Sequence, residues 1–274
     1  WSSDVCSSDL IMTAITLELI KELRDATGVS ITECKKALEE TEGNIDAAID
    51  ALRAKGIAKA GKRADNATHE GRIQIKHDGK KAYVASLTCE TDFVARTDNF
   101  ANFIAELMEV LIKAGSVEEA KAAFTPRMSD IIQQTGENVV FGPMDVIDAP
   151  VIGSYVHSNS KVAAVVSANA GTDEEKVRQV AMHVTATNPT GLRVSEFPAD
   201  AIAHERGVQM DMMKQDPKNA GKPENILSNI IEGKMKKFVE EGTLLTQAFV
   251  VNPDQTIEQY LGGDVLVAFK RYSI

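Results

Sequence analysis

The segment T-C-E-T-D-F-V-A-R-T, residues 88–97, places a thiol, two carboxylates and a phenylalanine between a strand-like run and a helix-like run. Such a cluster could form an active site, or it could be a probe that enters another protein. A nucleophilic Cys89 would need a base, and histidine is the usual one. None of the histidines has a recognised catalytic spacing; they are His69, His77, His157, His183 and His204. We therefore interpret Cys89 as a small buried residue at a strand end, and His183, in an apolar helical segment, as a core histidine.

Other chemistries find no support in the residue spacing. The sequence has no C-x-x-C, no H-E-x-x-H and no pair of histidines four residues apart, so the common metal-binding patterns are missing. The phosphate-binding patterns G-x-x-x-x-G-K-[ST] and G-x-G-x-x-G are missing as well. We interpret the basic turn with Lys214, Lys218 and Lys222 as a solvated loop tip. The sequence thus predicts no catalytic residue, no metal and no cofactor.

Composition limits the partners that the chain can have. With 43% hydrophobic and 26% charged residues, the 274-residue chain is typical of a soluble globular protein. Its net charge of -10 disfavours direct binding to nucleic-acid phosphates or to an anionic membrane surface. No apolar run approaches the roughly 20 residues of a membrane-spanning helix. A protein partner of basic or mixed charge remains open.

Residues 1–11 are rich in serine and precede the first methionine, Met12, so we interpret them as a non-native scar. After Met12 an amphipathic pattern begins directly, without a secretory signal. The remaining cysteines, Cys34 and Cys89, are too few for a disulfide framework. We therefore expect a protein of the reducing cytoplasm.

Residues 12–58 predict a compact bundle of three short helices. Apolar residues recur with helical spacing in three segments, which A-T-G-V-S and E-G-N separate. Ser30 and Glu33 have the spacing of a capping box at the second helix, and Asn44 can cap the third. Residues 59–70 are polar and rich in alanine and glycine, which indicates a linker.

Two modules of similar plan follow the linker. Residues 71–148 predict a strand hairpin with a D-G turn, two helices and a third strand within residues 136–150. Residues 149–198 repeat the order strand, polar turn, strand, Thr-Asp and helix, and residues 243–274 return a strand that should complete the second sheet. Residues 199–242 predict an inserted antiparallel helical hairpin. The predicted fold class is therefore α+β, with small antiparallel sheets.

The repeat allows the two Thr-Asp sites to be compared. Thr172-Asp173 is followed by two glutamates, which is an ordinary helix start with carboxylates at the positive end of the helix dipole. Thr91-Asp92 is followed instead by phenylalanine and valine. Phe93 could fold back onto its own helix as a hydrophobic staple, or it could project towards a partner. The local pattern leaves both interpretations open.

Motifs that occur in one order along the chain carry a resemblance to a family. They are the helical run I-K-E-L-R-D-A-T-G-V-S-I-T-E-C and then C-E-T-D-F-V-A-R, G-S-Y-V-H, A-M-H-V, E-G-K-M-K-K-F and L-L-T-Q-A-F-V. Over residues 12–272 the chain resembles the elongation factor Ts family of bacterial translation. The resemblance implies a ubiquitin-associated-like (UBA-like) bundle at residues 12–58 and a coiled coil at residues 199–242. It also implies a guanine nucleotide exchange factor for elongation factor Tu, not an enzyme, that acts in protein biosynthesis.

The resemblance assigns the exchange role to Asp92 and Phe93, with Thr91 and Val94 as neighbours that shape the turn. In the family, this pair inserts between two helices of the GTPase domain, beside the region that supports the Mg²⁺ of the nucleotide. Because Mg²⁺ bridges phosphate oxygens and protein ligands, loss of its support should weaken GDP binding. The factor would bind both GDP-bound and nucleotide-free elongation factor Tu.

Further contacts with elongation factor Tu are implied at Val29, Ile31 and Lys35 in the bundle and at His157 in the second module. His157 could equally be an exposed turn residue. The helical hairpin serves self-association in some members, so a homodimer through it is open. The chain departs from the family where many members continue into a carboxy-terminal helix, which would lower affinity or indicate a truncated tail.

Two other functions remain as alternatives to nucleotide exchange. One is a non-catalytic UBA-type protein-binding module on an α+β scaffold, in which residues 12–58 recognise a ubiquitin-like or peptide surface. The other is a thiol enzyme that uses Cys89.

Overall fold

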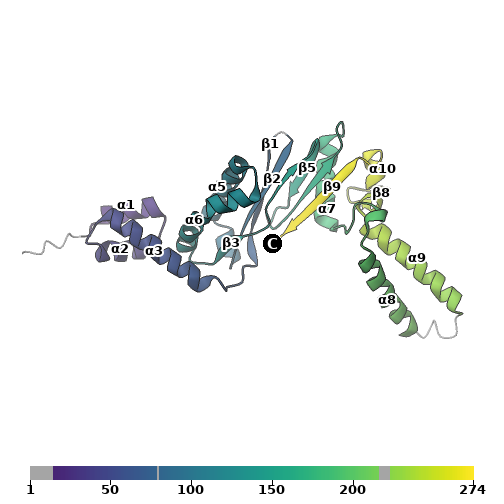
Figure 1. Ribbon diagram of the computed structural model, residues 1–274, viewed down its shortest axis with the longest axis horizontal. Helices are drawn as coiled ribbons and strands as arrows, with labels where there is room; N and C mark the ends of the chain where they lie inside the picture. The colour runs from purple at the N-terminus through teal and green to yellow at the C-terminus, as the bar shows by residue number, and fades with distance from the viewer. Residues whose placement is uncertain (1–14, 79, 216–222) are drawn as a thin grey trace, which may run out of the picture. The chain divides into compact units, whose positions relative to one another are not determined.

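The computed structural model describes residues 15–78, 80–215 and 223–274 (Figure 1). The predicted scar, residues 1–11, lies outside the described residues. The chain forms two compact units, one with the residues up to Arg72 and Ser86–Gly142, the other with Ile73–Ala85 and Pro143–Ile274. Helices and small antiparallel sheets make up the described parts, which confirms the α+β class.

The first unit begins with three helices, α1 (Leu17–Thr27), α2 (Ile31–Glu40) and α3 (Ile45–Arg63). Each starts at a side chain that accepts a backbone N–H, namely Thr16, Ser30 and Asn44. Their shared core includes Leu23, Leu38 and Leu52. The three predicted helices are therefore present, whereas their UBA-like character stays a prediction.

Helix α3 continues to Arg63, into the segment that the sequence predicts as a linker. The cause is tertiary packing on α6 (Val117–Thr135). At Gly56 the two backbones approach so closely that an added Cβ would lie 3.0 Å from the carbonyl oxygen of Ser129. Gly56, just before the predicted linker, lets the two helices pack closely, whereas Gly61 within it faces open space.

The rest of the first unit contains the short helix α4 (Asp92–Ala95) and the long helix α5 (Asp98–Ala114), which packs on α6. The apolar face of α5 is buried, with Phe100, Leu107 and Leu111 fully enclosed. This face anchors the carboxyl-terminal side of the T-C-E-T-D-F-V-A-R-T segment.

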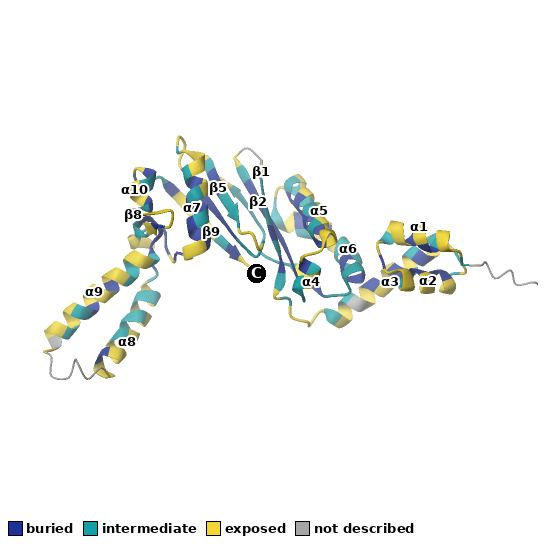
Figure 2. Cartoon of the chain, turned by 180° about the vertical axis from the view of Figure 1, so that it is seen from behind, coloured by how far each residue is buried: buried dark blue, intermediate teal, exposed yellow. Residues whose placement is uncertain are grey.

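The first sheet is built on β2 (Lys81–Cys89), which is buried along nearly its whole length (Figure 2). It pairs with β1 (Glu70–Asp78), with β3 (Val139–Phe141) and with β4 (Asp145–Asp148). The prediction of a single strand within residues 136–150 is therefore wrong. Gly142 and Pro143 separate β3 from β4, because proline has no N–H to donate to the ladder.

The second unit repeats the plan with β5 (Val151–Val156), β6 (Val162–Ala168), α7 (Glu174–Thr187) and β9 (Leu266–Ser273). The sheet order is β5-β6-β9, which confirms that the last strand completes it. Helix α7 packs against β5 and β6. The unit also contains β7 (Ala248–Phe249), β8 (Asn252–Thr256) and α10 (Ile257–Leu261).

Helices α8 (Ala199–Gln215) and α9 (Glu224–Gly242) lie side by side in the second unit, as the predicted hairpin requires (Figure 1). Met213, Ile231 and Met235 are buried between them. The predicted basic turn falls largely on residues 216–222, outside the described residues. Within the described ranges, no helix is both long enough and apolar enough to cross a membrane.

Gly153 on β5 should not tolerate a side chain, because an added Cβ would overlap main-chain atoms of Val177 and Arg178 on α7. We expect Gly153→Ala to lower the free energy of unfolding by about 1–3 kcal/mol, the usual cost of overpacking. Gly207→Ala on α8 is the matched control, since its Cβ would meet nothing, and it should be neutral or stabilising. Urea denaturation followed by circular dichroism measures both. Equal stability of the two variants would contradict the close approach.

His183 is buried, which confirms the prediction of a core histidine. Its Nδ1 accepts the N–H of Val250 at 3.3 Å, so its Nε2 carries the proton and donates to Gln247 Oε1 at 2.8 Å. Burial holds the pKa of His183 below its ordinary value, although the bond to Gln247 opposes the shift. The folded chain therefore resists protonation of this ring.

Because the folded-state pKa of His183 lies below the unfolded value of about 6.5, the unfolded chain binds the proton first as pH falls. The stability that neutral His183 contributes is complete above about pH 6.5 and is lost as pH falls from there towards the folded-state pKa. His183→Gln should therefore show a smaller loss of stability between pH 7.5 and pH 5.5 than the parent. Urea midpoints at the two pH values measure this, and equal losses would disprove the assignment.

Candidate protein-binding site

The T-C-E-T-D-F-V-A-R-T segment forms the end of β2, the single turn α4 and the start of α5. Thr91 caps α4, because its Oγ1 accepts the N–H of Val94 at 3.3 Å. Thr97 caps α5 in the same way, accepting the N–H of Phe100 at 3.2 Å. With a cap at each side, the residues between them form one isolated helical turn.

Phe93 lies in this turn and is 81% exposed, more than any other large apolar side chain that the structure describes. A hydrophobic staple would bury the ring, so the staple interpretation is wrong. The turn rests on the unit through Ala95, which is buried. Exposing a phenylalanine forgoes about 1.5–3 kcal/mol of apolar burial, which remains for a partner to gain.

Asp92, beside Phe93, pairs only with a surface arginine among the ion pairs described. Its Oδ2 lies 3.1 Å from Nη2 of Arg96, one turn along the chain, and the Arg96 side chain is 81% exposed. Exposed pairs of this kind contribute about 0.5 kcal/mol or less. The Asp92 carboxylate can therefore change partners at little cost.

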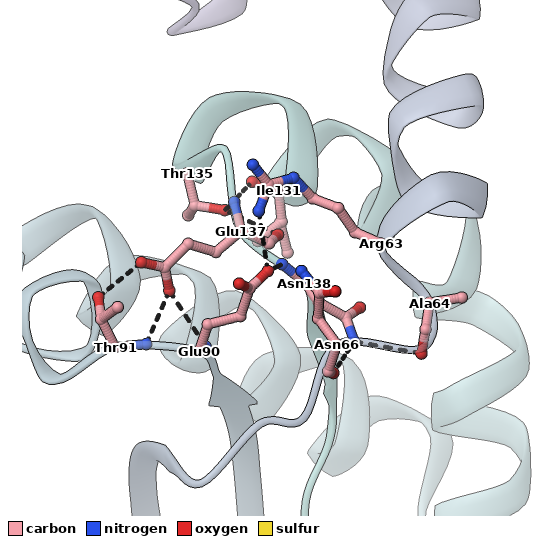
Figure 3. A network of polar contacts seen from close by, with 9 residues as sticks. All are labelled: Arg63, Ala64, Asn66, Glu90, Thr91, Ile131, Thr135, Glu137 and Asn138. Atoms are coloured by element: carbon pink, nitrogen blue, oxygen red, sulfur yellow. Dashed lines mark hydrogen bonds and ion pairs between the residues drawn. The ribbon is translucent and has the colours of Figure 1, made fainter.

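Two glutamates form the hydrogen bonds that fix the start of the turn (Figure 3). Glu137 Oε2 accepts the N–H of Glu90 at 3.1 Å and of Thr91 at 2.9 Å, and Glu137 Oε1 accepts the Thr91 hydroxyl at 2.6 Å. In the opposite direction, Glu90 Oε1 accepts the N–H of Asn138 at 2.6 Å and Nη1 of Arg63 at 3.0 Å. We call Glu90 and Glu137 the glutamate clasp. The bond from Asn138 is the main cause that holds the pKa of Glu90 below its usual value.

Cys89 completes the support of the turn rather than forming an active site. It is fully buried, which confirms its predicted place at a strand end, and its Sγ donates to the carbonyl of Thr91 at 3.2 Å. Burial, with the nearby carboxylates of Glu137 and Glu70, raises the pKa of Cys89 to about 12. A thiol with that pKa is protonated at neutral pH and is a poor nucleophile. Among the described residues, no group of three His, Cys, Asp or Glu side chains could hold a metal ion.

Of the three predicted contact residues in the bundle, two are exposed and one is buried. Val29 is 3% exposed and belongs to the bundle core. Ile31 and Lys35 lie one turn apart on α2, and both are exposed, with Lys35 Nζ 3.7 Å from Glu39. Only Ile31 and Lys35 can therefore offer side chains to a partner in this conformation.

His157 lies in the second unit, exposed, with its Nδ1 3.4 Å from the hydroxyl of Tyr155. Both residues line a cavity of about 300 Å³ together with Val250 and Val251, which are exposed valines. Neither valine was predicted from the sequence, although two adjacent valines before N-P-D are a visible signal. The glutamate clasp was not predicted either, because Glu137 is 46 positions from Thr91 and has the position of an ordinary strand start.

Comparison with known proteins relates nearly the whole chain to one family. Residues 90–274 match the family model described as "Elongation factor TS". A relative from Marinobacter nauticus, named "Elongation factor Ts", is 39% identical over 271 residues, which cover 96% of this chain and 92% of the relative. The family match begins at the glutamate clasp and includes the turn that exposes Phe93. The chain belongs to the elongation factor Ts family.

Proposed function

We propose that this protein is a guanine nucleotide exchange factor for the translational GTPase elongation factor Tu. The observation that carries the proposal is the 81% exposure of Phe93 on a turn whose backbone is fixed at Thr91. Membership of the elongation factor Ts family supports it. A single apolar ring, held outward by a rigid turn, is suited to enter a gap in another protein.

In the proposed mechanism, Asp92 and Phe93 enter between two helices of the GTPase domain of elongation factor Tu. The ring of Phe93 gains the burial that its own fold does not supply, and Asp92 exchanges Arg96 for donors of the partner. The displaced helices then support the Mg²⁺ and phosphates of GDP less well. Since binding of GDP and of the factor are linked, each weakens the other equally. No covalent bond is made or broken, so the factor is not an enzyme.

We place the other contacts with elongation factor Tu at Ile31 and Lys35 on α2 and at His157 in the second unit. Val29 would act from the bundle core, by supporting the start of α2. The proposed domains keep the predicted order, with the linker shortened to the residues after Arg63, where α3 ends. The hairpin at residues 199–242 is the proposed surface for a homodimer. A role in protein synthesis places the protein in the cytoplasm.

Phe93→Ala should leave the fold intact, because the ring makes little contact with it, and should change stability by no more than about 0.5 kcal/mol. Loss of a central apolar anchor costs a complex about 2 kcal/mol, so we expect GDP release to be accelerated roughly 30-fold less. Stopped-flow release of a fluorescent GDP analogue from elongation factor Tu measures this. Leu17→Ala, which removes an apolar side chain that is 80% exposed on α1, is the matched control. If GDP release is accelerated as much by Phe93→Ala as by the parent, the proposed role of Phe93 is wrong.

The double variant Ile31→Ala/Lys35→Ala should raise the concentration of factor needed for half-maximal exchange by about tenfold, as a contact worth about 1.4 kcal/mol would. Its maximal rate should stay that of the parent, because Phe93 remains in place. Lys36→Ala removes an equal charge from the neighbouring position of α2 and serves as the control. If both variants behave like the parent, α2 is not part of the contact.

A further inference from the structure

The pairing of β2 with β3 ends at Cys89 opposite Val139. Continued by one and two positions, the same register would set Glu90 opposite Asn138 and Thr91 opposite Glu137. At these two positions the glutamate clasp replaces the backbone ladder. Each glutamate reaches across to the backbone of the facing segment, Glu137 to Glu90 and Thr91, and Glu90 to Asn138. The clasp therefore extends the ladder to the point where α4 begins.

Glu137 also decides how Thr91 caps the turn. A threonine hydroxyl has one hydrogen and two lone pairs. Because Thr91 donates that hydrogen to Glu137 at 2.6 Å, its lone pairs are left to accept the N–H of Val94. Glu137 thus fixes the direction of the hydroxyl whose lone pairs cap α4.

Thr91 is held at each of its polar groups. Its N–H and hydroxyl donate to Glu137, and its carbonyl accepts from the Cys89 thiol and from the N–H of Ala95. Phe93, two residues further on, has almost no packing contact that could orient its ring. The direction of the ring is therefore set by the backbone of the turn, and the backbone of the turn is set by Thr91.

The clasp also reaches the end of α3 (Figure 3). Arg63, the last residue of α3, donates to Glu90 at 3.0 Å. Asn138 Nδ2 donates to the carbonyl of Asn66, just beyond that helix, at 2.8 Å. The turn is thus tied both to β3 and to the segment that leaves the bundle, so it cannot rotate without breaking several hydrogen bonds.

We propose that Glu137 is a positioning residue for nucleotide exchange, which acts by fixing the turn that presents Phe93 and not by touching the partner. The inference rests on the proposed role of Phe93. Removal of Glu137 should leave Phe93 exposed but free to adopt several directions. Binding through the other contacts should then persist, whereas the ring would reach its site in only a fraction of the complexes.

A double-mutant cycle on exchange tests this, with the parent, Glu137→Ala, Phe93→Ala and the combined variant. Maximal rate and half-saturating concentration of factor are measured by stopped-flow release of a fluorescent GDP analogue from elongation factor Tu. We expect Glu137→Ala to lower the maximal rate about tenfold and to change the half-saturating concentration less than about twofold. In the Phe93→Ala background the same substitution should lower the rate by less than about twofold, because there is no ring left to position.

Two further variants separate positioning from general stability. Glu137→Gln keeps one side-chain oxygen for the two backbone N–H groups and should restore most of the rate. If Glu137→Ala does not fold, Glu137→Met, which keeps the length of the side chain but has no oxygen to accept, replaces it in the cycle. Asp173→Ala is the matched control, since Asp173 Oδ1 likewise accepts two backbone N–H groups, from Glu175 and Lys176, in the second unit. It should lower the melting temperature and leave the rate of exchange unchanged.

The outcomes separate the proposed role of Phe93 from the proposed role of Glu137. If Phe93→Ala exchanges as fast as the parent, the proposed probe itself fails. If Phe93→Ala is slow but Glu137→Ala is not, or if the two effects multiply independently, the positioning role of Glu137 is overturned. A slow Asp173→Ala would attribute the effect of Glu137→Ala to lost stability, and would overturn it as well.

Discussion

The cap that Thr91 forms on α4 is the interaction on which the exposed surface around Phe93 depends. A phenylalanine that is 81% exposed gains nothing from its own fold, so no packing term selects its direction. The only restraint available is the backbone, and the backbone of a single helical turn is stable only when its ends are held. Thr91 and Thr97 supply those ends, and the glutamate clasp holds Thr91 in turn.

The two modules show how one plan gives a long structural helix in one place and an isolated turn with an exposed phenylalanine in the other. In the second unit, Asp173 itself is the cap, and α7 runs on to Thr187 without a break. In the first unit the cap moves one residue back, to Thr91, so the equivalent aspartate, Asp92, enters the helix and is released from capping. Thr97 then interrupts the helix and starts a new one. A shift of one residue thereby frees both an aspartate and the ring beside it.

The sequence predicted those features that depend on neighbouring residues. The caps at Ser30 and Asn44, the buried end of β2 at Cys89 and the core position of His183 follow from residue type and periodicity, and the structure confirms them. The projection of Phe93 could not be predicted, since a staple and a projecting ring share one pattern and differ only in tertiary packing. The glutamate clasp joins residues 46 positions apart, and a single sequence taken alone gives no signal for a contact at that separation. Val29 was expected to make a contact, but the bundle core needs its side chain.

The exposed area around Phe93 is small, and this limits what the ring can do. One side chain, flanked by the ion pair of Asp92 and Arg96, is far from the extended apolar patch that usually marks a stable interface. Most of the affinity for a partner must therefore come from other surfaces, such as the exposed face of α2. A bound protein shifts an equilibrium only as far as its contacts differ between the two states. Contacts that persist in the GDP-bound and nucleotide-free states add affinity alone. In the proposed mechanism, exchange is therefore driven by Phe93, the residue whose burial differs between the two states. Rigid presentation of its ring raises the fraction of encounters in which the ring is buried.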